Sequence, residues 1–304
     1  MTIDRDTRAV DVTKKSNLNV RFSSMMNLPG APERVRIVGI LNVTPDSFSD
    51  GGRWLTPRDA ASHGVHLHAV GADLIDVGGE STRPGACRVN EDEELRRILP
   101  VVRALRQAGV PVSVDTTRSR VARASLEAGA TMINDVSGGT ADPGMASAVM
   151  EAGCPWILMH NRGSSATMQA LAEYTDVVEE VADELSRRID AALAAGVAAE
   201  QIVIDPGLGF AKCPRHNWKL LARIERLTSL GFPVLIGASR KSFLGRLLAD
   251  EQGNTRPVMQ REDATTAITT YAALAGVWGV RVHDVRASAD AALAAAAIRT
   301  AQAG

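Results

Sequence analysis

Short apolar runs in this sequence repeatedly end in residues that can bind or polarise a ligand. The residues at these ends are amides, carboxylates, hydroxyls and cations: Asn42, Glu80, Thr82, Arg83, Asp115, Asn134, Asp135, His160, Asp205, Ser239, Arg240, Lys241, Arg281 and His283. The cations suit an anionic ligand, and the carboxylates suit a ligand face that is rich in hydrogen-bond donors. A phosphate-bearing heterocycle combines both properties, so we predict a ligand of this class.

Each of these residues also has a purely structural interpretation. Asp115 or Asp135 could cap a helix, and the segment 205–207 (DPG) could form a turn, because aspartate readily bonds to nearby backbone groups. Taken singly, neither interpretation is preferred. If none of the runs ended in a functional residue, so many polar groups at their ends would be hard to explain. The set as a whole therefore indicates a site.

Other catalytic arrangements have less support in the residue pattern. No serine or cysteine nucleophile with a histidine partner is evident, and possible carboxylate pairs have no distinctive spacing. The segment 42–45 (NVTP) follows the first run, where a dinucleotide-binding protein would carry a glycine-rich motif. Cys87, Cys154 and Cys213 form neither a metal-ligand nor a disulfide pattern, and we interpret them as thiols in a reducing cytosol.

The apolar runs are near-continuous rather than alternating, as in parallel strands that are buried on both faces. There are eight of them: Val35–Leu41, Leu74–Val77, Pro111–Val114, Thr131–Ile133, Trp156–Met159, Ile202–Ile204, Pro233–Ile236 and Val280–Val282. Helix-like segments separate them. This alternation predicts an α/β fold, a single-domain (β/α)8 TIM barrel whose site lies at the carboxyl ends of the strands. Periodicity does not show closure, so a doubly wound open sheet is the alternative.

Capping signals mark several of the intervening helices. Thr56 precedes a proline, and the pairs Asn90/Glu93 and Asp176/Glu179 have the spacing of a capping box. In the segments that follow the last two caps in the sequence, apolar residues are spaced so that they lie on one face of a helix. These residues are Leu95, Ile98, Leu99, Val102 and Leu105, then Val177, Val181, Leu185, Ile189 and Leu193, with Gly196 as a stop. Two alanine-rich segments, Thr265–Gly276 and Ser288–Ala301, are also helix-prone.

The overall composition is that of a globular protein, with 45% hydrophobic and 23% charged residues among 304. A net charge of −1 gives no electrostatic signal for nucleic acid or an anionic membrane. No apolar run approaches the ~20 residues of a transmembrane helix, and the polar first 30 residues lack the apolar core of a secretory signal. We therefore predict a loose tail over 1–33, a barrel domain over 34–304, a cytoplasmic location, and no nucleic-acid or membrane partner.

Two long segments resemble the signature motifs of the dihydropteroate synthases. They are Gly39–Asp50 (GILNVTPDSFSD) and Asp76–Gly85 (DVGGESTRPG). Shorter matches follow in the family's order: Ser113–Asp115, Ile133–Asp135, Met159–His160, Asp205–Phe210, Ser239–Ser242 and Arg281–Asp284. The resemblance implies a (β/α)8 barrel and a magnesium-dependent transferase of folate biosynthesis, a sulfonamide target, which joins a pterin diphosphate to p-aminobenzoate. It also implies a homodimer, for which the alanine-rich C-terminal helices could serve.

The resemblance further implies roles for individual residues of this sequence. Asn42 would coordinate Mg²⁺ bound to the diphosphate. The pterin would be held by Thr82, Asp115, Asn134, Asp205 and Lys241, and the diphosphate by Arg281 and His283. The p-aminobenzoate pocket would be formed by Phe48, Arg83, Pro84 and Ser242. We expect catalysis to depend on Asp115, Lys241, Arg281 and His283.

Two other functions remain possible for such a barrel. Methyltransferases that move a methyl group from a reduced folate to a corrinoid protein share the pterin-binding barrel. They expel no diphosphate, so they would not be expected to need Ser239–Ser242 or Arg281–His283, both of which are present. An inactive pterin-binding paralogue would have a decayed site, whereas each residue assigned a role by the resemblance has the type that the family carries there.

Overall fold

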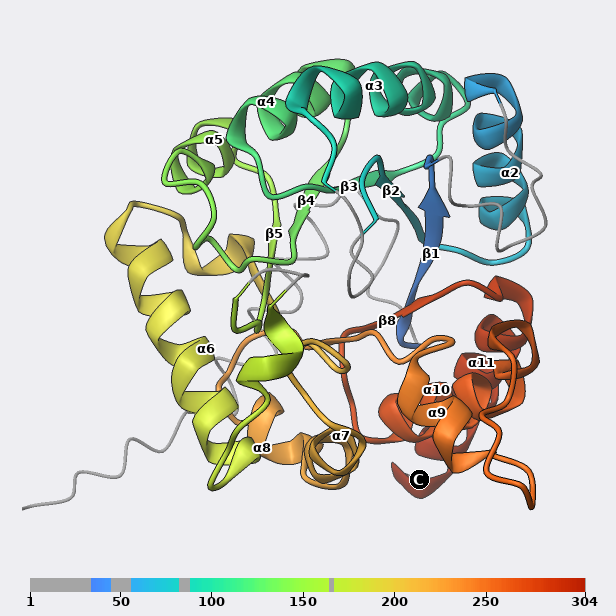
Figure 1. Cartoon of the computed structure of the whole chain (residues 1–304). Helices are drawn as coiled ribbons and strands as arrows, with labels where there is room; N and C mark the ends of the chain where they lie inside the picture. The colour runs from blue at the N-terminus through green and yellow to red at the C-terminus, as the bar shows by residue number, and fades with distance from the viewer. Residues whose placement is uncertain (1–33, 45–55, 82–87, 164–166, 304) are drawn as a thin grey trace, which may run out of the picture.

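The strands form one parallel sheet that closes into a barrel (Figure 1). The computed structural model describes residues 34–44, 56–81, 88–163 and 167–303. Its strands are β1 (Arg36–Asn42), β2 (Leu74–Gly78), β3 (Val112–Asp115), β4 (Met132–Asp135), β5 (Trp156–Met159), β6 (Ile202–Asp205), β7 (Leu235–Ile236) and β8 (Gly279–Val282). Their order is β6-β5-β4-β3-β2-β1-β8-β7, and a parallel bridge between Ile204 and Val234 closes the ring. The (β/α)8 prediction is confirmed, and the open-sheet alternative is wrong.

Alternate residues of each strand face the barrel interior. The interior is filled by a separate apolar cluster: Val38, Leu74, Met132, Ile157, Val203 and Leu235. Residues one position along the strands, such as Ile37, Ile75 and Ile133, pack instead into the larger core between strands and helices. Because the interior cluster is buried throughout, any cavity must lie beyond it, toward the strand ends.

Helices cover the outside of the barrel (Figure 1). They are α2 (Pro57–Ala69), α3 (Glu91–Gln107), α4 (Ser119–Ala128), α5 (Met145–Ala152), α6 (Val177–Ala194), α7 (Pro214–Ala222), α8 (Ile224–Thr228), α9 (Ser242–Leu247), α10 (Glu262–Leu274) and α11 (Val285–Ala303). The predicted caps Thr56, Asn90 and Asp176 each accept a hydrogen bond from the first turn of their helix. They satisfy N–H groups that lack a partner inside the helix, and so fix where α2, α3 and α6 begin.

The first turns of α3 and α6 both differ from the predicted capping boxes. In α3, the carboxylate oxygens of Glu93 accept from Arg96 and Arg97. The carboxylate that returns to the backbone N–H of Asp176, at 3.0 Å, belongs to Glu180. Glu179 pairs instead with Arg223, just before α8, and with Arg226 inside α8. Leu193, predicted on the buried face, is 39% exposed, whereas Ala192 is buried. The reason is that a helix of 3.6 residues per turn drifts away from a strict spacing of four.

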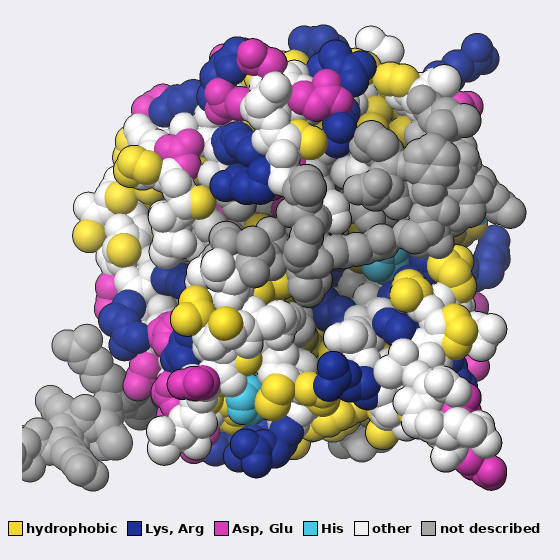
Figure 2. Space-filling model, in the orientation of Figure 1, with side chains coloured by type: hydrophobic (Ala, Val, Ile, Leu, Met, Phe, Trp, Pro, Cys, Tyr) yellow, Lys and Arg dark blue, Asp and Glu magenta, His cyan; other side chains and the backbone are white. Residues whose placement is uncertain are grey.

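Positive and negative side chains are interspersed on the face seen in Figure 2. This distribution agrees with a net charge of −1. Within the described ranges, no helix combines the length and the apolar character that a membrane span requires.

Candidate active site

A cavity of about 380 Å³ lies at the carboxyl ends of the strands. The polar residues that line it at these ends are Asn42, Asp115, Asn134, Asp205, Arg281 and His283. On β1, β4 and β6 these residues lie an even number of positions beyond the apolar residue that fills the barrel, so they also face inward. The sheet register sets Asp115 directly beside Asn134. Residues far apart in the sequence therefore meet in one site, as the strand ends predicted.

A buried ion-pair network lies at the inner end of this cavity. Nε of Arg281 donates to Oδ2 of Asp76 at 2.6 Å, and its Nη2 donates to Oδ2 of Asp115 at 3.1 Å. The side-chain amide of Asn134 donates to the same oxygen of Asp76 at 2.9 Å. One arginine on β8 thereby joins acidic residues of β2 and β3, and its orientation is fixed from two sides.

Asp76 is a central residue that sequence reasoning missed. Its side chain is fully buried, and Oδ1 has no hydrogen-bond partner in the described part of the chain. A signal was present, because one charged residue interrupts an otherwise apolar strand, at the same parity as the inward-facing Leu74. Burying a carboxylate costs several kcal/mol unless it is paired. Asp76 is therefore best explained by its bonds to Arg281 and Asn134.

Asp205 and Lys241 supply further charge to the cavity. Oδ1 of Asp205 accepts from the backbone N–H of Gly207 at 2.7 Å. Nζ of Lys241 donates to the carbonyl of Leu208 and lies 4.9 Å from the centre of the Phe210 ring. Burial raises the pKa of Asp205 against the opposing charge of Lys241, and burial lowers the pKa of Lys241 to about 8. Both ionised groups therefore gain from a polar ligand that replaces the lost water.

Carboxylates outnumber cations around Arg281. Burial raises the pKa of Asp115, the charge of Arg281 opposes this shift, and the charge of Asp76 adds to it. Asp76, Asp115 and Asp205 lie close to Arg281 and Lys241, while Arg240 and Arg261 line other parts of the cavity. The inner cavity therefore favours a ligand that brings hydrogen-bond donors or positive charge.

His283 continues the lining beyond the end of β8. Oγ of Ser239 accepts from the backbone N–H of His283 at 3.2 Å and lies 2.9 Å from its Nδ1. A hydroxyl can donate or accept, and when that of Ser239 donates to Nδ1 of an uncharged ring, the ring proton is on Nε2. In that tautomer Nε2 offers an N–H donor to an anion.

Comparison with known proteins identifies the family. The model of the pterin binding enzymes matches residues 38–283. The dihydropteroate synthase of Mycobacterium leprae is 57% identical over 258 residues, which are 84% of this chain and 91% of that protein. The chain belongs to the dihydropteroate synthase family.

Solved structures of the family agree with the architecture. The Yersinia pestis dihydropteroate synthase in a sulfonamide drug complex has a TM-score of 0.83 at 41% identity, covering 88% of this chain and 95% of that one. The Xanthomonas albilineans dihydropteroate synthase in complex with 7,8-dihydropteroate has a TM-score of 0.76 at 43% identity, covering 88% and 94%. Both relatives are therefore similar to this chain over nearly the whole barrel.

The cavity gathers most of the residues that the family resemblance assigns: Asn42, Asp115, Asn134, Asp205, Lys241, Ser242, Arg281 and His283. Phe48, Thr82, Arg83 and Pro84 lie outside the described residues, so their roles stay predictions. The structure adds lining side chains that sequence reasoning missed: Met159, Met168, Gln169, Phe210, Val258 and Arg261. Two of them had a signal, since Met159 begins the short family motif Met159–His160 and Phe210 ends the motif that begins at Asp205.

Two other polar residues at the strand ends face away from the cavity. Asp135 accepts from the backbone N–H groups of Ser137 and Gly139, both at 2.8 Å, so it has a structural role, although it stabilises a turn rather than the helix cap of its alternative interpretation. His160 is fully buried between Lys212 and Glu184. Each directly follows an inward-facing residue, so the pleat of the strand turns it outward.

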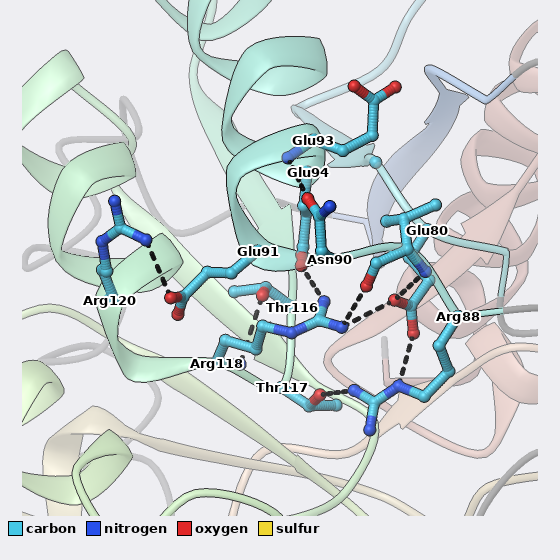
Figure 3. A network of polar contacts seen from close by, with 12 residues as sticks. Glu80, Arg88, Asn90, Glu91, Glu93, Glu94, Thr116, Thr117, Arg118 and Arg120 are labelled. Carbon is cyan, nitrogen blue, oxygen red and sulfur yellow. Dashed lines mark hydrogen bonds and ion pairs between the residues drawn. The ribbon is translucent and has the colours of Figure 1, made fainter.

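A second charged network borders the cavity and connects α3 to the strand ends (Figure 3). Arg118, just before α4, pairs with Glu94 of α3 and, at 3.0 Å, with Glu80 after β2. It also donates to the carbonyl of Val89 at 2.7 Å. Glu80 pairs in addition with Arg88 at 3.1 Å. Since the chain itself supplies a cation to each carboxylate, this network indicates structural support rather than a ligand site.

Proposed function

We propose that the cavity joins p-aminobenzoate to the methylene carbon of (7,8-dihydropterin-6-yl)methyl diphosphate, giving 7,8-dihydropteroate and diphosphate. One observation carries this proposal. A compact set of buried or half-buried donors and acceptors lies at one end of a barrel that is otherwise packed with apolar side chains: Asp115, Asn134, Asp205 and Lys241. Membership of the family and the relative solved with 7,8-dihydropteroate support the same reaction.

Asp205 would recognise the pterin edge through two parallel hydrogen bonds. A pterin presents a ring N–H beside an exocyclic amino group, and two parallel donors match one carboxylate. Oδ1 of Asp205 already accepts from Gly207, but a carboxylate has about four acceptor positions and can still accept both donors. Asn134 can donate and accept. Lys241 only donates, so it would meet the ring carbonyl or a ring nitrogen.

Arg281 and His283 would bind the diphosphate. Two nitrogens of Arg281 are held by Asp76 and Asp115, so its Nη1 group would contact the phosphate oxygens. His283 would contribute its Nε2–H, in the orientation that Ser239 imposes on the ring. Donors that are fixed in advance stabilise the negative charge that grows on a leaving group without further reorganisation.

Asn42 would hold Mg²⁺ together with the diphosphate. Its side chain lines the cavity at the end of β1, and an amide oxygen is a ligand that hard cations accept. A single neutral protein ligand suits an ion that keeps several waters and takes phosphate oxygens as its other ligands. When bound, Mg²⁺ would neutralise charge on the departing diphosphate.

The arylamine needs no strong base, because its nitrogen is uncharged near neutral pH. Its lone pair forms the new C–N bond, the bond between the methylene carbon and the diphosphate oxygen breaks, and the amine gives one proton to water. When bond breaking runs ahead of bond making, the methylene carries positive charge, which the Asp115 carboxylate would stabilise. Arg281 holds one oxygen of Asp115 and so orients this carboxylate.

The p-aminobenzoate pocket would lie at the mouth of the cavity. Ser242 is exposed there, next to Lys241, and can donate its hydroxyl proton to a carboxylate. Phe210 supplies an aromatic wall on which an aryl ring can pack. The remaining walls are predicted to come from Phe48, Arg83 and Pro84.

Release of diphosphate from the pterin substrate, measured with and without p-aminobenzoate, tests the proposal. We expect sustained release only when the arylamine is present, with an equal amount of dihydropteroate formed. An inactive paralogue would release no diphosphate, and a corrinoid methyltransferase would demethylate methyltetrahydrofolate instead. Either result would overturn the proposed function.

We also infer a homodimer, as the family resemblance implies, and a cytoplasmic location, as the unpaired pattern of cysteines indicates. The helices α10 and α11 pack against each other on the outer wall (Figure 1). They expose several large apolar side chains: Tyr271, Leu274, Leu293 and Ile298. Light scattering of the purified protein tests the association, and a monomer at micromolar concentration would contradict it. Cell fractionation tests the location.

A further inference from the structure

The loop that follows β6 has a backbone path that few residue types can adopt. Gly207, Gly209 and Ala211 have φ angles of +66°, +82° and +48°, in the left-handed region that L side chains rarely occupy. A Cβ atom on Gly207 would lie 1.9 Å from the carbonyl oxygen of His160, so the loop lies directly against the end of β5. Ala211 lacks the freedom of glycine and is fully buried, so its surroundings must hold its conformation.

Side chains hold three successive carbonyl groups of this loop. Lys241 and Gln169 donate to the carbonyls of the segment Leu208–Gly209. Lys212 donates from Nζ to the carbonyl of Phe210 at 3.0 Å, reaching back over the left-handed residue between them. This last bond closes the turn, and it therefore fixes the backbone from which the Phe210 ring projects.

Lys212 is buried and is linked to a carboxylate through a histidine. Its side chain is 3% exposed, and Nζ lies 2.9 Å from Nδ1 of His160. The Glu184 carboxylate only accepts, so Nε2 of His160 carries the ring proton and donates to it at 3.0 Å, which leaves Nδ1 of the neutral ring to accept from Lys212. This relay runs from the cavity wall to α6.

The placement of Lys212 has an electrostatic cost that an apolar residue would avoid. Methionine would occupy a similar volume without the cost of burying an ammonium. What the lysine adds is a directed hydrogen bond to the carbonyl of Phe210. Phe210 lines both the main cavity and a neighbouring one of about 280 Å³ that also includes Asp115. The position of its ring therefore shapes the wall that the two cavities share.

We propose that Lys212 is a positioning residue for p-aminobenzoate, acting through the carbonyl of Phe210. The relay through His160 to Glu184 holds the ammonium in place. The inference rests on the proposed function, because it takes the arylamine to pack on Phe210. Pterin binding depends on other groups, chiefly Asp205, so it should change little when Lys212 is replaced.

Lys212→Met in the full chain tests this inference, with Lys219→Met, an exposed lysine of α7, as the matched control. We expect the KM for p-aminobenzoate to rise about tenfold, the change that one lost charge-assisted hydrogen bond gives. The Kd for the pterin diphosphate, measured by calorimetry without p-aminobenzoate, should stay within about threefold. The control should match the wild type in both. An unchanged KM, or KM and Kd rising together, would overturn the inference.

A double-mutant cycle with Phe210→Ala separates positioning from a general weakening of the fold. When Lys212 acts through Phe210, adding Lys212→Met to Phe210→Ala raises the KM no further, whereas additive effects contradict the inference. Should Lys212→Met not fold, Lys212→Gln carries the same expectations, because its shorter side chain cannot reach both Phe210 and His160. A wild-type chain that binds the pterin diphosphate but forms no dihydropteroate would instead reject the proposed function.

Discussion

Inward-facing and outward-facing polar residues alternate at the strand ends, and the chain satisfies them to different degrees. Asn134 lines the cavity, whereas its neighbour Asp135 faces away and accepts three hydrogen bonds from residues 137–139. On the inward side, Oδ1 of Asp76 has no partner within the described ranges. The carboxylate of Asp135 is thus used by the fold, whereas the side chain of Asn134 borders the cavity, where a ligand can bind.

The structure distinguishes two kinds of charged cluster that cannot be told apart in the sequence. The Arg118 network borders the cavity, but its carboxylates are paired by the chain itself (Figure 3). In the cavity, by contrast, Asp115, Asp205 and Lys241 line open space in which a ligand can bind them. Substitutions on the inward side should therefore reduce binding, and substitutions on the outward side should reduce stability.

The largest effect on binding is expected for Asp205→Ala. It would leave two donors of the bound pterin without acceptors, at roughly 1–3 kcal/mol each. We expect the affinity for the pterin diphosphate to fall by about 4 kcal/mol, roughly a thousandfold in Kd. Isothermal titration measures this directly. The melting temperature should not fall in proportion, and near-normal affinity would show that Asp205 is not the recognition residue.

Arg118→Met should reduce stability next most strongly. It leaves the carboxylate of Glu94, only 1% exposed, without its cation. Removing one partner of a buried pair costs about 3–5 kcal/mol. We expect a loss near the lower bound, because Arg118 itself is partly exposed. Urea unfolding measures the loss, and kcat per folded molecule should be retained.

Two companion variants sharpen this result. Adding Glu94→Gln to Arg118→Met removes the unpaired charge and should recover part of the stability. Arg120→Met is the matched control, because Arg120 is 59% exposed and pairs with Glu91 and Asp92 at the surface, where such pairs contribute little. If Arg120→Met lost as much stability as Arg118→Met, burial of the ion pair would not determine the loss of stability.

The neighbours Asn134 and Asp135 allow the most direct comparison. Asn134→Ala should weaken pterin binding by about 2 kcal/mol and change stability less, because the residue faces the cavity. Asp135→Ala should do the opposite, with about 2 kcal/mol lost in stability, since it leaves two backbone N–H groups unpaired. Calorimetry measures pterin binding and urea unfolding measures stability in both variants. If each variant lost binding and stability to the same extent, the two residues would not differ as their contacts indicate.

The fold could be predicted from the sequence because its signals are local. Buried parallel strands are recognised as short apolar runs, and the caps Thr56, Asn90 and Asp176 mark helix starts with single side chains. The extents of the strands were less certain. The run predicted at 233–236 is a strand only over Leu235–Ile236, because Val234 makes a single bridge that closes the ring. Closure depends on contacts between distant segments, which periodicity does not contain.

The site was predictable in its residue types but not in its orientation. Leu74–Gly78 is buried on both faces, so the run alone does not show that Asp76 points inward and Val77 outward. The same ambiguity made His160 look equivalent to the cavity residues. Orientation follows from the register between strands, such as Gly78 beside Asp115, and register is a tertiary property.

The pH dependence of stability should also differ between outward-facing and inward-facing groups. Burial lowers the pKa of His160 from 6.5 to about 3, and the charge of Lys212 adds to this shift. Between pH 6.5 and about pH 3, His160 is uncharged in the folded state and protonated in the unfolded chain, so the folded state binds fewer protons. The stability that is present above pH 6.5 is therefore lost as the pH falls toward 3. His160→Gln should flatten this loss, whose slope is at most ~1.4 kcal/mol per pH unit.

Asp115, on the inward side, should show the reverse sign. Burial raises its pKa above the ordinary 3.8, so the folded state keeps a proton that the unfolded chain releases. Its contribution to stability is complete below pH 3.8 and is lost as the pH rises through the raised pKa. Urea unfolding from acid to neutral pH measures both effects. Relative to the wild type, Asp115→Asn should gain stability toward neutral pH, and His160→Gln should lose less toward acid. If both variants changed the slope of stability against pH in the same direction, inward and outward groups would not differ as their contacts indicate.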